Sequence, residues 1–122
     1  MAGFLGIEFT EVGEDFITAK MPVNERTRQP FGILHGGASV VLAETLGSIA
    51  SFLTIDTEKF NAVGLEVNAN HLRSVAAGFV TGICRPINIG RKIHVWEIKM
   101  FDDNRKMNCV SRLTVAIIDK QQ

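Results

Sequence analysis

The sequence is poor in the residues from which small secreted scaffolds and metal sites are built. Its 122 residues include two cysteines, Cys84 and Cys109, three histidines and no tyrosine. Two cysteines cannot form a multi-disulfide scaffold, and neither they nor the widely separated histidines have metal-ligand spacing. We therefore expect two reduced thiols in the core of a cytoplasmic protein, no metal site and no cofactor.

Neither sign of charge is in excess. Lys plus Arg and Asp plus Glu each number 13, so the formal net charge at pH 7 is zero. This balance argues against a basic nucleic-acid-binding surface and against a polybasic membrane anchor. It also means that long-range electrostatic repulsion does not oppose self-association.

Targeting segments, linkers and several common catalytic motifs are absent as well. The N-terminal residues lack a basic region followed by a long apolar run, which argues against a signal peptide. The apolar stretch 36–54 contains a glutamate and several serines, so we do not expect it to span a membrane. There is no P-loop and no Gly-x-Ser-x-Gly motif. Since no linker or repeat divides the chain, we expect residues 1–122 to form one domain.

Alternation of apolar and polar residues predicts six strands. They cover Leu5–Thr10, Asp15–Val23, Ala62–Leu72, Gly78–Pro86, Arg91–Phe101 and Met107–Ile118. Turns are predicted at Gly13, at Asn88-Ile89-Gly90 and at Asp102-Asp103-Asn104. Within the third strand, Val63, Leu65, Val67 and Ala69 are expected to share one face.

One long helix is predicted over Ala38–Leu53, after the sequence His35-Gly36-Gly37. Apolar residues lie on nearly every side of it, which is the pattern of a helix buried on most faces. The order is two strands, one helix and four strands. This predicts an α+β architecture, in which an antiparallel sheet of about six strands curls around a central helix.

Glu44 is the residue most indicative of chemistry. It is the only ionisable side chain from Gly36 through Thr54, and the residues three and four positions away are uncharged. A buried carboxylate without a partner is costly, so Glu44 is expected to have a partner or to face a cleft. There it could act as a nucleophile or as a general base toward water. The alternative is a surface position on a solvated edge of the helix.

The sequence His35-Gly36-Gly37 is a second candidate. Glycines allow a ligand to approach the backbone closely, and the first amides of a helix point outward without internal acceptors. Such donors suit an oxyanion, although glycines at a helix start can also serve close packing alone. Glu44 follows Gly36 by eight residues, or about 12 Å of helix. One chain therefore cannot bring both groups to one reacting atom. A second copy of the chain is expected to supply the other group to each site.

Five further side chains are weaker candidates. Ser48 lies one turn after the glutamate and could bond substrate or simply allow close packing. His71 and Arg73 share one face at a strand end, where they could meet a polar substituent and a phosphate or remain solvated. His94 and Trp96 share a face in a later strand, where packing is the expected role.

Several motifs together resemble one known family. They are Gln29-Pro30-Phe31-Gly32-Ile33-Leu34-His35-Gly36-Gly37, Ala43-Glu44-Thr45, the segment Gly64–Arg73, Val95–Ile98 and Ser111–Thr114. In this order they resemble the hotdog-fold acyl-CoA thioesterases. The resemblance begins near Gly6 and is strongest to bacterial aryl-CoA enzymes that act on hydroxybenzoyl-CoA, phenylacetate-pathway or dihydroxynaphthoyl-CoA esters or proofread enterobactin synthesis. Relatives usually carry further residues before the first strand, which help to close the acyl pocket.

The resemblance implies a role for each matching residue. Glu44 would attack the thioester carbonyl or activate water, Gln29 would position that water or carbonyl, and the Gly36 amide would bind the oxyanion. His35 would lie beside the thioester, Ser48 near the carboxylate, His71 in the substrate pocket and Arg73 near the CoA phosphates. The site would form at a homodimer interface, with Glu44 opposite Gln29 and Gly36 of the other chain, and two dimers would pair into a homotetramer.

The predicted function is therefore hydrolysis of an acyl-CoA thioester to free acid and CoA. Two alternatives stay open at this point. A hotdog hydratase or dehydratase would need His35 and would release a product that keeps its thioester. A non-catalytic acyl-CoA-binding module would bind CoA esters without turnover and would have no need of Glu44.

Overall fold

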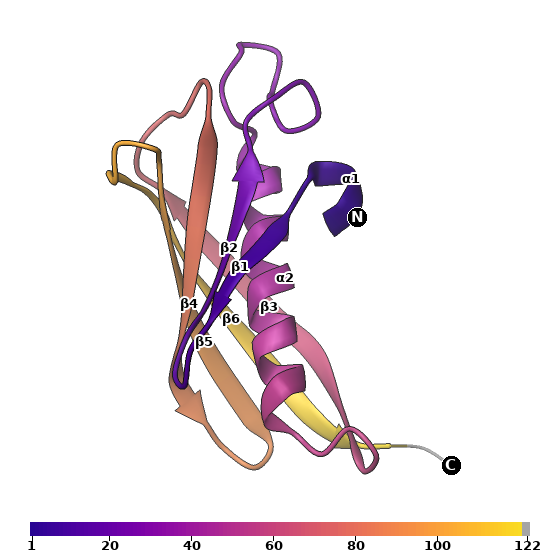
Figure 1. Cartoon of the computed structure of the whole chain (residues 1–122). Helices are drawn as coiled ribbons and strands as arrows, with labels where there is room; N and C mark the ends of the chain where they lie inside the picture. Colours follow the sequence, from indigo (N-terminus) through magenta and orange to yellow (C-terminus); the bar gives the residue numbers. More distant parts are fainter. Residues whose placement is uncertain (121–122) are drawn as a thin grey trace.

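Six antiparallel strands form one sheet, and a long helix lies along one of its faces (Figure 1). The computed structural model describes residues 1–120. Its elements are α1 (Ala2–Leu5), β1 (Glu8–Val12), β2 (Ile17–Pro22), α2 (Gly36–Thr54), β3 (Phe60–His71), β4 (Phe79–Ile89), β5 (Ile93–Phe101) and β6 (Met107–Asp119). The strands lie in the order β1-β2-β4-β5-β6-β3, so β1 and β3 are the edges. The predicted α+β architecture is confirmed.

Two predicted boundaries are wrong for local reasons. Leu5 belongs to α1, which Gly6 ends in a left-handed conformation, so the first strand starts only at Glu8. The predicted turn at 88–90 is also misplaced, because Asn88 and Ile89 still pair with β5. A bulge after Pro86 adds one residue to β4 and thereby delays the turn.

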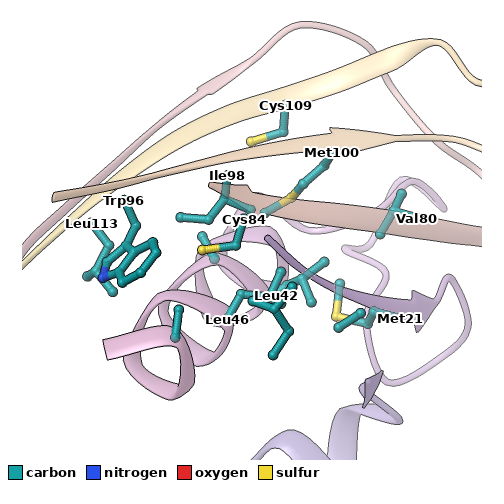
Figure 2. Packing of buried hydrophobic residues seen from close by; sticks show 14 of the residues in the cluster. Met21, Leu42, Leu46, Val80, Cys84, Trp96, Ile98, Met100, Cys109 and Leu113 are labelled. Atoms are coloured by element: carbon teal, nitrogen blue, oxygen red, sulfur yellow. The ribbon is translucent and has the colours of Figure 1, made fainter. Parts of the chain in front are cut away.

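The core lies between α2 and the sheet. Leu42 and Leu46 lie on the helix among buried side chains of the strands, and both approach Gly82 of β4 together with Ile98 of β5 (Figure 2). Gly82 of β4 permits this contact, because a Cβ atom there would lie 2.7 Å from Leu46 Cδ1. Each fully buried leucine stabilises the fold by about 1.5–3 kcal/mol. Both cysteines are also buried and unpaired, and burial raises the pKa of Cys84 to about 12.

The prediction that α2 is buried on most faces is wrong. The sheet covers only one side of the helix, and Glu44, Phe52 and Leu53 are exposed on the chain. By length and composition α2 could also cross a membrane, but 44% of its most apolar window is buried against the rest of the fold. An apolar helix surface remains uncovered.

The edge strand β3 does not keep the simple alternation expected of it. A bulge between Gly64 and Glu66 shifts its phase. Val63 and Leu65 are therefore exposed, whereas Val67 is partly buried against the core. The prediction that these four apolar residues share one face of the strand is therefore wrong.

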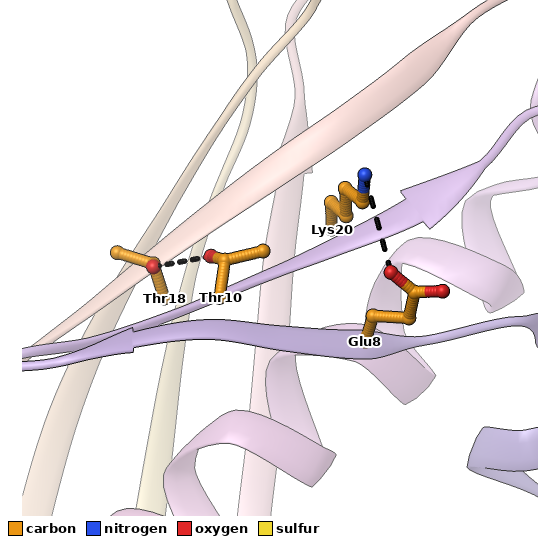
Figure 3. Close-up of polar contacts among 4 residues, drawn as sticks. All are labelled: Glu8, Thr10, Thr18 and Lys20. Atoms are coloured by element: carbon orange, nitrogen blue, oxygen red, sulfur yellow. Dashed lines mark hydrogen bonds and ion pairs between the residues drawn. The ribbon is translucent and has the colours of Figure 1, made fainter.

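The two edges of the sheet differ in length and in charge. The short β1 is tied to β2 by a 2.6 Å bond between the Thr10 and Thr18 hydroxyls and by Glu8, whose carboxylate lies 3.9 Å from Lys20 Nζ (Figure 3). Short, charged edges discourage strand addition. The 12-residue β3 presents a long edge with exposed apolar side chains instead.

Candidate active site

A cavity of about 340 Å³ lies at the N-terminal end of α2. It brings together four of the residues predicted from the sequence: Gln29, Gly36, His71 and Arg73. They come from the loop before α2, from the first residue of the helix and from the end of β3 with the segment after it. Segments far apart in the sequence therefore meet at one end of the helix.

The start of α2 is shaped by its two flanking side chains. His35 is the N-cap residue, and its Nδ1 accepts a 2.8 Å hydrogen bond from the Gly37 amide. His35 itself does not line the cavity. A Cβ atom at position 36 would lie 3.0 Å from His71 Nε2, so glycine lets the imidazole of His71 approach the helix start. Within residues 1–120 the Gly36 amide has no hydrogen-bond acceptor, as is usual for a first-turn amide.

Gln29 is held by a tight turn. Its amide donates to the Ile33 carbonyl at 2.8 Å, and its carbonyl accepts from Gly32 at 2.9 Å. The Phe31 amide donates to Gln29 Oε1. Since Oε1 is occupied in this way, the Nε2 amino group is the end of the side chain that can donate to a ligand.

His71 and Arg73 both line the cavity, although β3 ends at His71 and Arg73 follows it outside the strand. His71 ends β3, and the amides of Leu72 and Arg73 donate to the Asn108 carbonyl at 2.8 and 3.3 Å. This anchoring to β6 fixes the direction of the chain after the strand. Both side chains remain exposed on the chain.

Glu44 and Ser48 lie elsewhere on α2. Glu44 is exposed, and its Oε2 lies over Gly64 of β3, where a Cβ atom would be 3.1 Å away. Within residues 1–120 it has no ion-pair partner and does not line the cavity, so one chain does not bring it to Gly36. Ser48 is partly buried, and no hydrogen bond joins it to Glu44 in this part of the chain.

The predicted packing role of His94 and Trp96 is confirmed at the other end of the helix. Trp96 Nε1 donates to Ser51 Oγ at 2.7 Å, and Ser51 Oγ lies 2.9 Å from His94 Nδ1. All three side chains are buried. Burial lowers the pKa of His94, although a hydrogen bond with the Gly90 backbone acts in the opposite direction.

Sequence reasoning missed Asn108. This side chain of β6 lines the cavity and is 3% exposed. The only signal was a polar residue beside the buried Cys109 at the start of an otherwise regular strand.

Comparison with known proteins identifies the family. Residues 31–109 match the model of the thioesterase superfamily. The chain is 52% identical over 118 residues to the 1,4-dihydroxy-2-naphthoyl-CoA hydrolase of Escherichia coli K12, covering 97% of this chain and 86% of that protein. It is 49% identical over 114 residues to the proofreading thioesterase EntH of Cronobacter turicensis, covering 93% and 82%.

Solved structures agree with these relatives. A variant of thioesterase PA1618 from Pseudomonas aeruginosa superposes with a TM-score of 0.97 at 52% identity, covering 98% of this chain and 86% of that one. Thioesterase HI1161 from Haemophilus influenzae superposes with a TM-score of 0.95 at 52% identity, covering 99% and 84%. The chain therefore belongs to the thioesterase superfamily and is a hotdog-fold enzyme that hydrolyses thioesters.

Proposed function

We propose that the chain hydrolyses a small acyl-CoA, with an aryl acyl group, in a site completed by a second copy of itself. The observation that carries this is the placement of Glu44. An exposed carboxylate on an otherwise apolar helix surface has no partner within residues 1–120, while Gln29 and Gly36 lie at a separate cavity. A two-fold dimer would bring the Glu44 of each chain to the cavity of the other.

The surface around Glu44 supports such an interface. The free edge of β3 can accept another strand, and Val63 and Leu65 expose apolar side chains along it. Phe52 and Leu53 extend this apolar surface on α2. Burial of these groups would favour association, and two such dimers would pair into a homotetramer.

The reaction follows from the groups that the dimer would assemble. The carbonyl oxygen of the thioester would accept a hydrogen bond from the Gly36 amide. The positive end of the α2 dipole would lie behind that amide and strengthen the interaction. Such a donor stabilises the developing oxyanion by about 3–4 kcal/mol. Glu44 would either attack the carbonyl carbon or take a proton from a water that attacks it, and Gln29 Nε2 would orient that water or the carbonyl. In the general-base route, collapse of the tetrahedral intermediate would release the free acid, and CoA would leave as its thiol with the proton that Glu44 took from water. In the nucleophilic route, CoA would leave first and take a proton from solvent, and water would then hydrolyse the mixed anhydride on Glu44 to the free acid.

The remaining residues would bind the substrate. His71 would contact the acyl or thioester end, and Arg73 would pair with a phosphate of CoA. His35 and Ser48 would lie beside the thioester and the carboxylate, respectively. The aryl acyl group is proposed from the relative named as a 1,4-dihydroxy-2-naphthoyl-CoA hydrolase. A cytoplasmic location fits a CoA ester as substrate.

The test is to mix two inactive variants. Glu44→Ala and Gln29→Ala should each lower kcat for benzoyl-CoA by about 10²–10⁴-fold, measured as thiol release, without loss of the fold. If each site combines Glu44 of one chain with Gln29 of the other, heterodimers of the two variants contain one intact site. Co-refolding equal amounts should then restore about a quarter of the wild-type activity.

Four outcomes would oppose the proposal. If Glu44→Ala keeps its activity, the carboxylate has no catalytic role. If the mixture is no more active than its components, the site is not shared between two chains. A product that keeps its thioester, with His35 essential, would indicate a hydratase or dehydratase. Tight CoA-ester binding without thiol release would indicate a binding module.

A further inference from the structure

Asn108 occupies an irregular position in β6. Met100 of β5 pairs with Cys109, but the next residue, Phe101, pairs with Met107. Asn108 is therefore the extra residue of a β-bulge. In a regular strand Asn108 and Cys109 would point to opposite faces, whereas here they are 3% and 0% exposed, and Asn108 lines the cavity on the helix side of the sheet.

One atom of the Asn108 side-chain amide is buried without a partner in the described part of the chain. This atom is the amide oxygen, Oδ1. Buried polar atoms are nearly always bonded, so an exception beside a cavity indicates a group kept for a ligand. The carboxamide carries an acceptor in Oδ1 and donors in Nδ2, so it has both of the groups that a ligand amide would need.

The other cavity residues indicate what Asn108 would meet. Gly36 and Arg73 line the same cavity, and under the proposed function they bind the thioester oxygen and a phosphate. In an acyl-CoA these two groups are joined by the pantetheine arm, which carries two secondary amides. A carboxamide is complementary to a secondary amide, because each has a donor and an acceptor.

We propose that Asn108 is a substrate-binding residue whose side-chain amide hydrogen-bonds an amide of the pantetheine arm. This inference rests on the proposed function for the nature of the substrate. The bulge in β6 would therefore recognise the CoA part of the ester, whatever acyl group it carries.

The test uses two thioesters with the same acyl group. Benzoyl-CoA carries the amides, whereas the benzoyl thioester of 2-mercaptoethanol carries none. Asn108→Leu, which keeps the size and removes the amide, should lower kcat/KM for benzoyl-CoA about five- to tenfold and change it less than twofold for the short ester. Because the buried Oδ1 has no partner to lose among residues 1–120, the melting temperature of Asn108→Leu should be unchanged or higher. Asn108→Ser provides a second, smaller replacement.

Ser111→Ala is the matched control. Ser111 is buried on the same strand, but its hydroxyl donates to the Asn68 carbonyl at 2.6 Å. Its replacement should lower the melting temperature and affect both esters equally. The same behaviour in both Asn108 variants would overturn the inference, because it would show a structural role.

Binding separates this inference from the proposed function. The dissociation constant of CoA alone, measured by calorimetry, should rise five- to tenfold in Asn108→Leu even if the wild type hydrolyses no benzoyl ester. Equal affinities in variant and wild type, or no CoA binding by the wild type, would overturn the inference. If the wild type releases thiol and the variant binds CoA as tightly as the wild type, the proposed function is supported and the role of Asn108 is refuted.

Discussion

The two ends of α2 carry polar clusters of opposite character. At the C-terminal end, Ser51, His94 and Trp96 are buried and hydrogen-bonded to one another. At the N-terminal end, the Gly36 amide and Asn108 Oδ1 have no partner within residues 1–120, and both belong to residues that line an open cavity. The same helix therefore ends in a closed cluster and begins in an unsatisfied one.

The difference teaches how to separate groups that hold the fold from groups available for a ligand. A buried polar group that bonds its neighbours stabilises the fold modestly, and removal of one member leaves the others unsatisfied at a larger cost. A group without a protein partner adds no such stability. Substitution at the closed end should therefore change stability, and substitution at the open end should change substrate binding or turnover.

The largest effect is expected from a pair of serines one turn apart on α2. Ser51→Ala leaves Trp96 Nε1 and His94 Nδ1 unpaired in the core and should lower the free energy of unfolding by about 2–4 kcal/mol. Ser48 makes no side-chain hydrogen bond within residues 1–120, so Ser48→Ala should stay within about 0.5 kcal/mol of wild type. Urea unfolding measures both. Equal losses from the two serines would break the distinction.

A smaller loss of stability is expected at His94 as the pH falls. Because burial lowers the pKa of His94 in the folded chain, the unfolded chain, where histidine titrates near 6.5, binds the proton more readily. The stability contributed by neutral His94 is complete above pH 6.5 and is lost as the pH falls below it. Unfolding free energies measured between pH 7 and 5 should therefore decline, and less steeply in His94→Gln. An identical slope in that variant would contradict the assignment.

The smallest effect is an expected lack of reaction at the two core thiols. Burial raises the pKa of Cys84 to about 12 and raises that of Cys109, and a thiol must ionise to react. A disulfide reagent should modify neither thiol in the native protein, and both in denaturant. Fast native labelling of either cysteine would show that the core opens more readily than its packing implies.

The sequence predicted the fold well because its signals were local. Alternation located six strands, and the single long apolar segment located α2. The bulges were missed, since an extra residue in β3 or β6 depends on the partner strand and leaves no mark in the pattern of one strand. That is why Val63 was wrongly predicted to share a face with Val67.

The candidate site was predictable only in part. The sequence predicted His71 and Arg73 to be neighbours, and both line the cavity, although Arg73 lies beyond the end of β3. The two glycines at the start of α2 indicated an open helix start. The exposure of Glu44 on the chain was one of two alternatives that the sequence left open, because an uncovered apolar helix surface has the same composition as one buried in the core. Asn108 could not be recognised because its orientation depends on pairing with β5.

The bulge in β6 also bears on how this cavity can change over generations. A strand reverses its facing side with each residue added or removed, so gain or loss of a single codon near position 108 could exchange the side chain offered to the cavity. The adjoining ladder would keep its pairing beyond that point. Insertion or deletion of a residue, as well as amino-acid replacement, is then a route by which such an enzyme could acquire a different substrate preference.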